Sequence, residues 1–167
     1  MKIVVVGDTL VSSDYMEKQA ERLFPGHDKK IVKFDWEMKT KEEFQEVILD
    51  LEKNGPEARK LSEEITNELK DADILMVHFA PVSKATLDKA GNLKLIGTCR
   101  GGVEHIDIEA ATEKNIPVLH VIRNAEPVAE FTLGLIYSEC RNITRSHVSI
   151  INGGWRKSFP NSRYVTT

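Results

Sequence analysis

The chain has 167 residues, of which 41% are hydrophobic and 29% are charged, and its formal net charge at pH 7 is -3. This composition is typical of a soluble globular domain with a sizeable core, and the small charge excludes strong electrostatic binding of nucleic acid or of an anionic membrane. The two cysteines form no CxxC pair and the five histidines show no metal-ligand spacing, so neither a disulfide framework nor a metal site is indicated. Because there is no apolar run of membrane length and no secretory signal, we expect a cytoplasmic protein.

Short apolar runs alternate with helical patterns through the first 121 residues. The predicted strands cover residues 2–6, 30–34, 73–77, 93–97 and 117–121. The predicted helices end near residues 23, 53, 69, 89 and 114, and four of them have N-caps at Ser12 or Ser13, Thr40, Ser83 and Asp107. This alternation predicts a flavodoxin-like or Rossmann-like α/β fold, with about five parallel strands and helices on both faces. Ligands of such sheets bind beyond the carboxyl ends of the strands, here residues 7–9, 78–81, 97–103 and 122–124.

A loop with two adjacent glycines, Gly101 and Gly102, follows the fourth predicted strand. Glycines leave the backbone N–H groups open to close approach by a ligand, and the helix expected to open at Ile106-Asp107 would favour an anion. The loop therefore predicts a site for a carboxylate or a phosphate. A tight turn that binds nothing is an equally open interpretation of the same pattern.

The last predicted helix begins near Asn124, with Pro127 in its first turn, and runs to the glycine pair at residues 153–154. Its apolar residues do not lie on one stripe, so it needs cover on more than one face. We expect a partner domain or a second subunit to provide this cover; a deep groove in the same domain is the alternative. Residues 155–167 are polar without periodicity, which is typical of a connector.

The ordered set of motifs in the second half of the chain resembles the D-isomer-specific 2-hydroxyacid dehydrogenase family, which includes the phosphoglycerate dehydrogenase-like enzymes. The resemblance is carried by LKLI at residues 93–96, GGVEHID at 101–107, AA at 110–111, NIPV at 115–118, RNAEPVAEFTLGL at 123–135, RNI at 141–143 and GGWR at 153–156. HFAPV at residues 78–82 adds weaker support.

The resemblance implies the substrate-binding half of a two-domain, NAD(P)-dependent oxidoreductase that acts on the CH–OH group of a 2-hydroxy or 2-keto acid. Residues 1–123 would form the substrate-binding α/β domain, 124–154 an interdomain and dimerisation helix, and 155–167 a connector toward a cofactor-binding domain. The implied substrate-binding residues are His78, Phe79, Arg100, Gly101, Gly102 and Val103; Gly101 would also lie near the nicotinamide. The implied partners are a small carboxylate-bearing substrate, the cofactor domain and a second copy of the chain.

The dinucleotide fingerprint GxGxxG does not occur in the 167 residues. In the family, the catalytic Arg, Glu and His lie beyond the stretch that this chain matches, so no catalytic residue is assigned here. We therefore expect a truncated form that binds no NAD or NADP by itself and is inert alone, because hydride transfer needs the cofactor held against the substrate.

Three other functions do not fit the same residues. A cysteine phosphatase needs an Arg six positions after Cys99, where His105 stands. A receiver domain needs an acidic pair after the first strand, where Asp8 is nearly alone. An FMN site needs a glycine-containing phosphate loop at that place, where Thr9, Ser12 and Ser13 occur without glycines and read as a helix cap. A non-enzymatic α/β module for small-molecule binding or for interaction, derived from a dehydrogenase domain, stays open.

Overall fold

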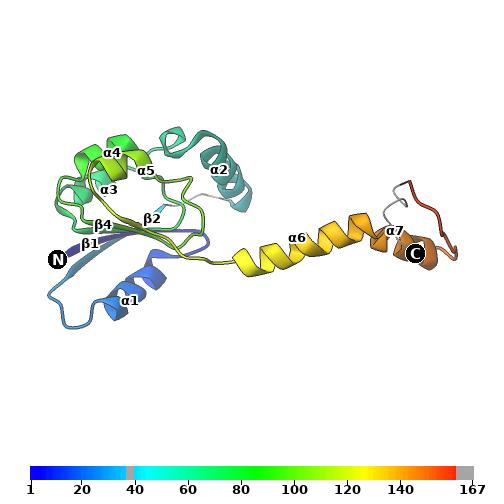
Figure 1. Cartoon of the computed structure of the whole chain (residues 1–167). Helices are drawn as coiled ribbons and strands as arrows, with labels where there is room; N and C mark the ends of the chain where they lie inside the picture. The colour runs from blue at the N-terminus through cyan, green and yellow to red at the C-terminus, as the bar shows by residue number, and fades with distance from the viewer. Residues whose placement is uncertain (37–39, 161–167) are drawn as a thin grey trace. The chain divides into compact units, whose positions relative to one another are not determined.

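Five parallel strands form the sheet at the centre of the unit Met1–Arg123 in the computed structural model, which describes residues 1–36 and 40–160 (Figure 1). The strands are β1 (Lys2–Asp8), β2 (Lys30–Trp36), β3 (Ile74–Val77), β4 (Leu95–Thr98) and β5 (Val118–Leu119), in the spatial order β2-β1-β3-β4-β5. The flavodoxin-like α/β fold predicted from the alternating pattern is thereby confirmed. β5 is shorter than expected, because only two of its residues pair with β4.

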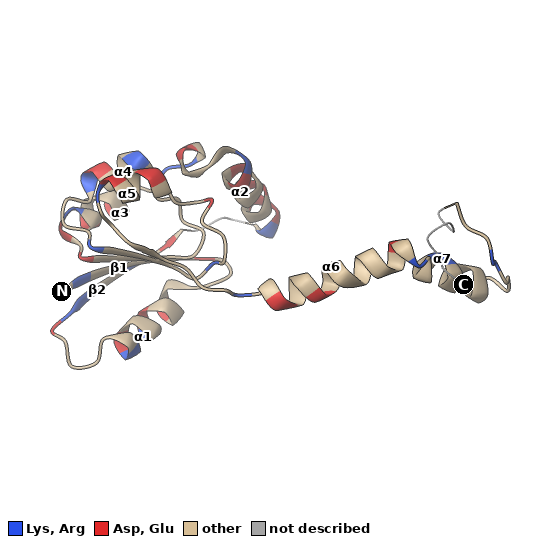
Figure 2. Cartoon of the chain, in the orientation of Figure 1, with Lys and Arg blue, Asp and Glu red and all other residues tan. Residues whose placement is uncertain are grey.

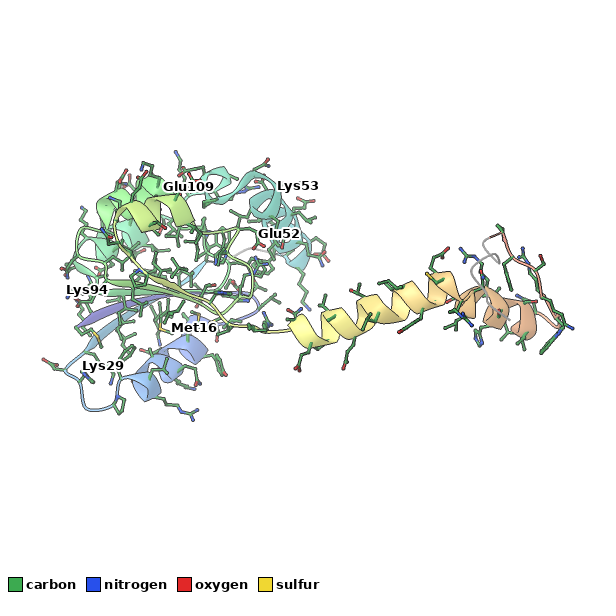
Figure 3. The ribbon with its side chains drawn as sticks, viewed as in Figure 1. Met16, Lys29, Glu52, Lys53, Lys94 and Glu109 are labelled. Carbon is green, nitrogen blue, oxygen red and sulfur yellow. The ribbon has the colours of Figure 1, made fainter. Side chains whose placement is uncertain are left out.

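Helices cover both faces of this sheet unequally. The helices α2 (Lys41–Asn54), α3 (Glu63–Glu68), α4 (Lys84–Lys89) and α5 (Ile108–Glu113) lie on one face, and α1 (Ser13–Leu23) lies on the other (Figure 1). A hydrophobic cluster lies on each face of the sheet, and alternate side chains of β1 pack into the two clusters. Val4 and Val6 belong to the larger cluster, and Ile3 and Val5 belong to the smaller one under α1. Figure 3 labels Met16 between α1 and the sheet, where only 1% of it is exposed. Both faces of the sheet are therefore buried over β1.

The helix starts follow the polar caps predicted from the sequence. The side chains of Ser12, Thr40, Ser83 and Asp107 each accept a hydrogen bond from the backbone N–H three residues on. The helix expected to end near residue 69 is present, but it is shorter than the pattern after Pro56 predicts. The chain forms a short 3-10 turn, η1 (Pro56–Ala58), then an extended segment, then α3 capped by Ser62, then a second turn, η2 (Leu69–Asp71). The extended backbone of Arg59 interrupts the helical pattern.

The prediction of a single helix over residues 124–152 is wrong, because two shorter helices with a turn between them occupy that segment. The second unit, Asn124–Thr167, contains α6 (Ala125–Cys140) and α7 (Ile143–Ile151) in its described part, and the seven residues 161–167 of the expected connector lie outside the described residues. Asn142 separates the two helices with a left-handed φ of 56°, a conformation that Asn tolerates and that an α-helix cannot include. Gly153 ends α7 with a φ of 75°, as the glycine pair predicts.

α6 carries apolar side chains on all sides. None of its residues is buried, and Figure 2 shows few charged residues along it. Its exposed apolar side chains are Val128, Phe131, Leu133, Leu135, Ile136 and Tyr137. Neither α6 nor any other helix in residues 1–36 and 40–160 is long and apolar enough to cross a membrane.

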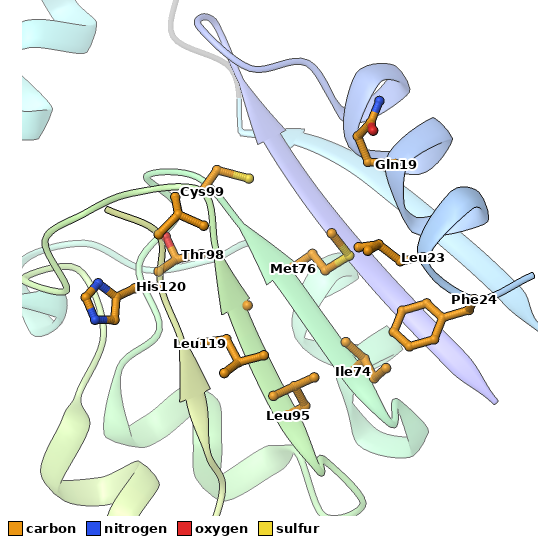
Figure 4. A pocket seen from close by; sticks show the side chains of 12 residues that line it. Gln19, Leu23, Phe24, Ile74, Met76, Leu95, Thr98, Cys99, Leu119 and His120 are labelled. Atoms are coloured by element: carbon orange, nitrogen blue, oxygen red, sulfur yellow. The ribbon is translucent and has the colours of Figure 1, made fainter. Parts of the chain in front are cut away.

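The face of the sheet that carries α1 is left partly open toward β5. An apolar groove of about 510 Å³ lies there, with Leu23 of α1 and the following Phe24 on one side and Leu95 and Leu119 on the other (Figure 4). Leu119 is 60% exposed as a result. One helix does not span the width of five strands, so this apolar surface is a direct consequence of the unequal distribution of helices.

Candidate functional site

The carboxyl edge of the sheet gathers side chains from four of the five strands. Asp8 ends β1, His78 follows β3, Thr98 ends β4 and Arg123 comes after β5. All four segments expected to form a site meet through hydrogen bonds at this edge, as parallel strands require.

Asp8 and His78 form a buried pair at the centre of this edge. The Asp8 residue is 4% exposed and His78 is fully buried, and His78 Nδ1 lies 2.8 Å from Asp8 Oδ2. The backbone N–H groups of Phe79, Leu10 and Val11 also donate to the Asp8 carboxylate. Burial raises the pKa of Asp8, but the hydrogen bonds from His78 and from the backbone N–H groups of Leu10 and Val11 outweigh it, so the pKa of Asp8 is lowered. Asp8 is therefore a fixed anion.

Arg123 determines which nitrogen of His78 carries the proton. Arg123 Nη1 lies 3.2 Å from His78 Nε2, and a guanidinium can only donate. His78 Nε2 is therefore the acceptor, and His78 Nδ1 holds the proton that it donates to Asp8. The three side chains form one directed chain of hydrogen bonds from the cation to the anion. Sequence reasoning assigned His78 to the wall of the cleft and did not assign Asp8 or Arg123 to the site.

Arg100 and Phe79 stack beside this pair. Arg100 Cζ lies 3.7 Å from the centroid of the Phe79 ring, a cation–π geometry, and Phe79 is 8% exposed. Arg100 Nη2 lies 3.2 Å from Oε1 of Glu52, which Figure 3 labels on α2, and 3.9 Å from Oε2 of Glu104. Within residues 1–36 and 40–160, Arg100 Nη1 is buried without a hydrogen-bond partner. The positive charge of Arg100 is thus held at the loop by two carboxylates and an aromatic face.

The double-glycine loop presents unpaired backbone donors. In the described part of the chain, the N–H groups of Gly101, Gly102 and Val103 donate to no other protein group. Gly101 is exposed, and Gly102 and Val103 are half-buried along a groove of about 470 Å³. The carboxylate of Glu104 lies against the bare side of Gly102. This arrangement can accept an acid group.

The helix after this loop starts where the sequence predicts. α5 begins at Ile108, and the side chain of Asp107 accepts a hydrogen bond from the backbone N–H of Ala110 at its start. Because a carboxylate of the chain already occupies that helix terminus, any affinity of the loop for an anion comes from its own N–H groups and from the neighbouring guanidinium groups.

His105 and Cys99 have structural roles in this loop. His105 is fully buried, its Nε2 lies 3.1 Å from Thr98 Oγ1, and burial, with the nearby charge of Arg100, lowers its pKa to about 3. It stays neutral and packs below the loop. Burial raises the pKa of the Cys99 thiol, which removes the thiolate that a cysteine phosphatase needs. No group of three or more potential metal ligands occurs among the residues that the structure describes.

Comparisons with known proteins agree with this architecture. Residues 31–166 match the family model "D-isomer specific 2-hydroxyacid dehydrogenase, catalytic domain". The chain is 42% identical over 100 residues, or 58% of its length and 19% of the relative's, to D-3-phosphoglycerate dehydrogenase of Methanocaldococcus jannaschii. It is 32% identical over 161 residues, or 93% of its length and 41% of the relative's, to formate dehydrogenase of Candida boidinii.

Solved structures show the same fold. The crystal structure of NAD⁺-bound 3-phosphoglycerate dehydrogenase of Entamoeba histolytica superposes with a TM-score of 0.54 at 21% identity, covering 84% of this chain and 39% of that one. The chain thus spans from about a fifth to two fifths of the length of these three proteins. From the family match, which covers most of its residues, the chain belongs to the D-isomer specific 2-hydroxyacid dehydrogenase family.

Proposed function

We propose that this chain supplies the substrate-binding half of an NAD(P)-dependent oxidoreductase acting on the CH–OH group of a 2-hydroxy acid or on the corresponding 2-keto acid. The observation that carries the proposal is the set of unpaired N–H groups at Gly101, Gly102 and Val103, in the described part of a chain that belongs to this family. Three donors in a row suit one carboxylate, which accepts through two oxygens.

The residues around the loop orient the acid and strengthen its binding. The stacked Arg100 keeps a guanidinium group beside the loop, because Phe79 and Glu52 hold it there. The buried His78 and Phe79 form the floor of the site. Gly101 is exposed and lacks a side chain, which fits the close approach of a flat ring. A nicotinamide bound there would supply or accept the hydride.

We further propose that residues 1–123 form the substrate domain and that α6 and α7 connect it to a cofactor domain and pair with a second copy. The apolar sides of α6 support this role, because such a helix needs cover in water. The catalytic acid–base groups and the dinucleotide site are not assigned to any residue of this chain. On this proposal the 167-residue chain binds acids but does not turn them over.

The proposed binding of an acid at the loop is tested by titrating the ¹⁵N-labelled chain with pyruvate. The amide signals of Gly101, Gly102 and Val103 should shift with a common dissociation constant. Gly102→Val should abolish these shifts while the other amide signals keep their folded positions, because Gly102 is not left-handed and the three heavy atoms nearest to an added Cβ all belong to the flexible Glu104 side chain. The control is Gly91→Val at an exposed turn, which should bind normally. Unchanged affinity in Gly102→Val would refute the loop assignment.

The proposal that the chain does not turn over acids by itself is tested by measuring NADH oxidation in the presence of pyruvate. The chain alone should show no turnover, and addition of a separately produced cofactor domain of a two-domain relative should restore some. Turnover by the chain alone at the rate of a two-domain relative would refute its inertness. Failure of the two parts to associate would instead favour a non-enzymatic module.

A further inference from the structure

Arg123 differs from Arg100 in the way its charge is compensated. Glu52 and Glu104 lie within 4.0 Å of the Arg100 guanidinium. No carboxylate of residues 1–36 and 40–160 lies that close to Arg123, whose one recorded side-chain partner there is the neutral acceptor His78 Nε2. A guanidinium has five N–H donors, so most of those on Arg123 are open to a ligand.

The buried Asp8–His78 pair sets the orientation of Arg123. Burying two polar side chains such as Asp8 and His78 costs free energy unless both are fully hydrogen-bonded. An arginine in water needs no buried acceptor, so this pair is not required merely to solvate Arg123. Here the Asp8 carboxylate fixes the His78 proton on Nδ1, which aims the free lone pair of His78 Nε2 at Arg123. A carboxylate that orients an imidazole through its other nitrogen is a common arrangement behind a group that must be held in one place.

Arg123 lies next to the double-glycine loop. The Val121 N–H donates to the Arg100 carbonyl at 3.1 Å, and His120 Nδ1 lies 2.9 Å from the Gly101 carbonyl oxygen. The Arg123 backbone nitrogen is 3.9 Å from the position that a Cβ would take on Gly101. The segment before α6 therefore runs alongside the loop and brings an oriented cation to its edge.

We propose that Arg123 binds an acidic group of the ligand, and that Asp8 acts through His78 to position the Arg123 guanidinium for it. The inference rests on the proposed function, because it takes the ligand to be an acid bound at the Gly101–Val103 loop. The acidic group is either the carboxylate next to the keto carbon or a second acid group elsewhere in the ligand. Asp8 and His78 are positioning residues, and Arg123 is the residue that touches the ligand.

The experiment measures dissociation constants of pyruvate, with one carboxylate, and 2-oxoglutarate, with two, for the 167-residue chain by NMR titration. Arg123→Met should weaken at least one of them about 10- to 100-fold, the usual effect of losing a charge-assisted hydrogen bond. An equal loss for both acids assigns Arg123 to the shared carboxylate, and a loss for 2-oxoglutarate alone assigns it to the second one. Arg123→Lys should recover only part of the affinity, because lysine lacks the planar fork.

Arg22→Met is the matched control. It removes the same charge from the exposed last turn of α1 and should leave both dissociation constants unchanged. If the wild-type chain binds neither acid, the proposed function itself fails. If the wild-type chain binds them and Arg123→Met binds both equally well, only the role of Arg123 is overturned.

The positioning role is tested by Asp8→Asn. An amide at this place can donate to His78 Nδ1, which moves the imidazole proton to Nε2. His78 Nε2 then carries a proton that faces the Arg123 guanidinium and can no longer accept its hydrogen bond. The ¹⁵N signals of the His78 ring report this change of tautomer directly. Asp8→Asn should weaken acid binding as much as Arg123→Met, and the double variant should be no weaker than either one. Additive losses in the double variant, or an unchanged tautomer with weakened binding, would show that Asp8 acts on the fold and not through Arg123.

Discussion

Gly7 lies where the chain after β1 folds back over the strand, and it offers a sharp test of the structure. A Cβ added there would lie 2.6 Å from the Ser12 carbonyl carbon and 2.7 Å from the Val11 carbonyl oxygen, and still closer to the Ser13 nitrogen. Carbon atoms meet at about 3.5 Å, so the backbone at the start of α1 would have to retreat by about 1 Å.

Moving the backbone at the start of α1 would disrupt several hydrogen bonds at once. The Ser13 N–H and hydroxyl donate to Asp35, and the Asp8 N–H donates to the Val11 carbonyl at 2.8 Å. Overpacking usually costs about 1–3 kcal/mol, and the obstacle here is backbone that cannot rotate away. We expect Gly7→Ala to lower the free energy of unfolding by about 3 kcal/mol, or the Tm by roughly 10 °C.

Urea unfolding monitored by circular dichroism gives the free energy, provided that the slope with urea stays constant. The control is Gly91→Ala, whose Cβ would lie 3.9 Å from the nearest heavy atom, the Lys70 carbonyl oxygen, and which should change stability by less than about 0.5 kcal/mol. If Gly7→Ala unfolds at the same urea concentration as Gly91→Ala, the close approach of residues 11–13 to β1 does not exist.

Three further predictions concern other parts of the chain. Because the fold lowers the pKa of Asp8, its ionised form stabilises the protein above the unfolded-state value of about 3.9, and this contribution is lost as the pH falls through the lower folded-state value. Urea unfolding between pH 6 and pH 3 should therefore show a steeper acid loss for the wild type than for Asp8→Asn, and parallel curves would contradict it. Asn115 ends α5 with a φ of 56°, so Asn115→Gly should keep or raise the Tm, whereas Asn115→Val should cost about 1–2 kcal/mol; equal Tm values for the two variants would be inconsistent with a left-handed residue. The 167-residue chain should self-associate in sedimentation experiments through α6, and Phe131→Glu with Leu135→Lys should reduce this; a monomeric wild type would show that α6 is covered within its own chain.

The elements that could be predicted from the sequence are those governed by local signals. Alternating apolar runs determined the sheet, and the polar caps at Thr40 and Ser83 determined helix starts, because a cap acts within three residues. The break at Asn142 was missed because an Asn inside an apolar periodic segment costs little in propensity and only its backbone angle reveals the joint. Gly55 and Pro56 end the preceding helix, but no local signal in the sequence shows that the extended backbone at Arg59 delays the next helix until Glu63.

The residue pattern predicts the four segments of the candidate site, but within them it singles out only the double-glycine loop. Two adjacent glycines after a strand are visible in a single stretch of sequence. The Asp8–His78–Arg123 chain is not, since its members are 70 and 45 residues apart and each one alone is an ordinary polar residue at a strand end. The link between them appears only when the sheet order places β1 beside β3 and brings the segment after β5 to the same edge.

The same spacing would make the proposed acid binding depend on the order of folding. The three residues come from the first strand, the third strand and the segment beyond the last strand, so no local piece of the chain can assemble them. Long-range contacts of this kind form late, after the entropy of closing the intervening loops has been overcome. In a refolding experiment, recovery of acid binding would therefore mark completion of the whole unit Met1–Arg123, later than the return of helical signal from α1 or α2.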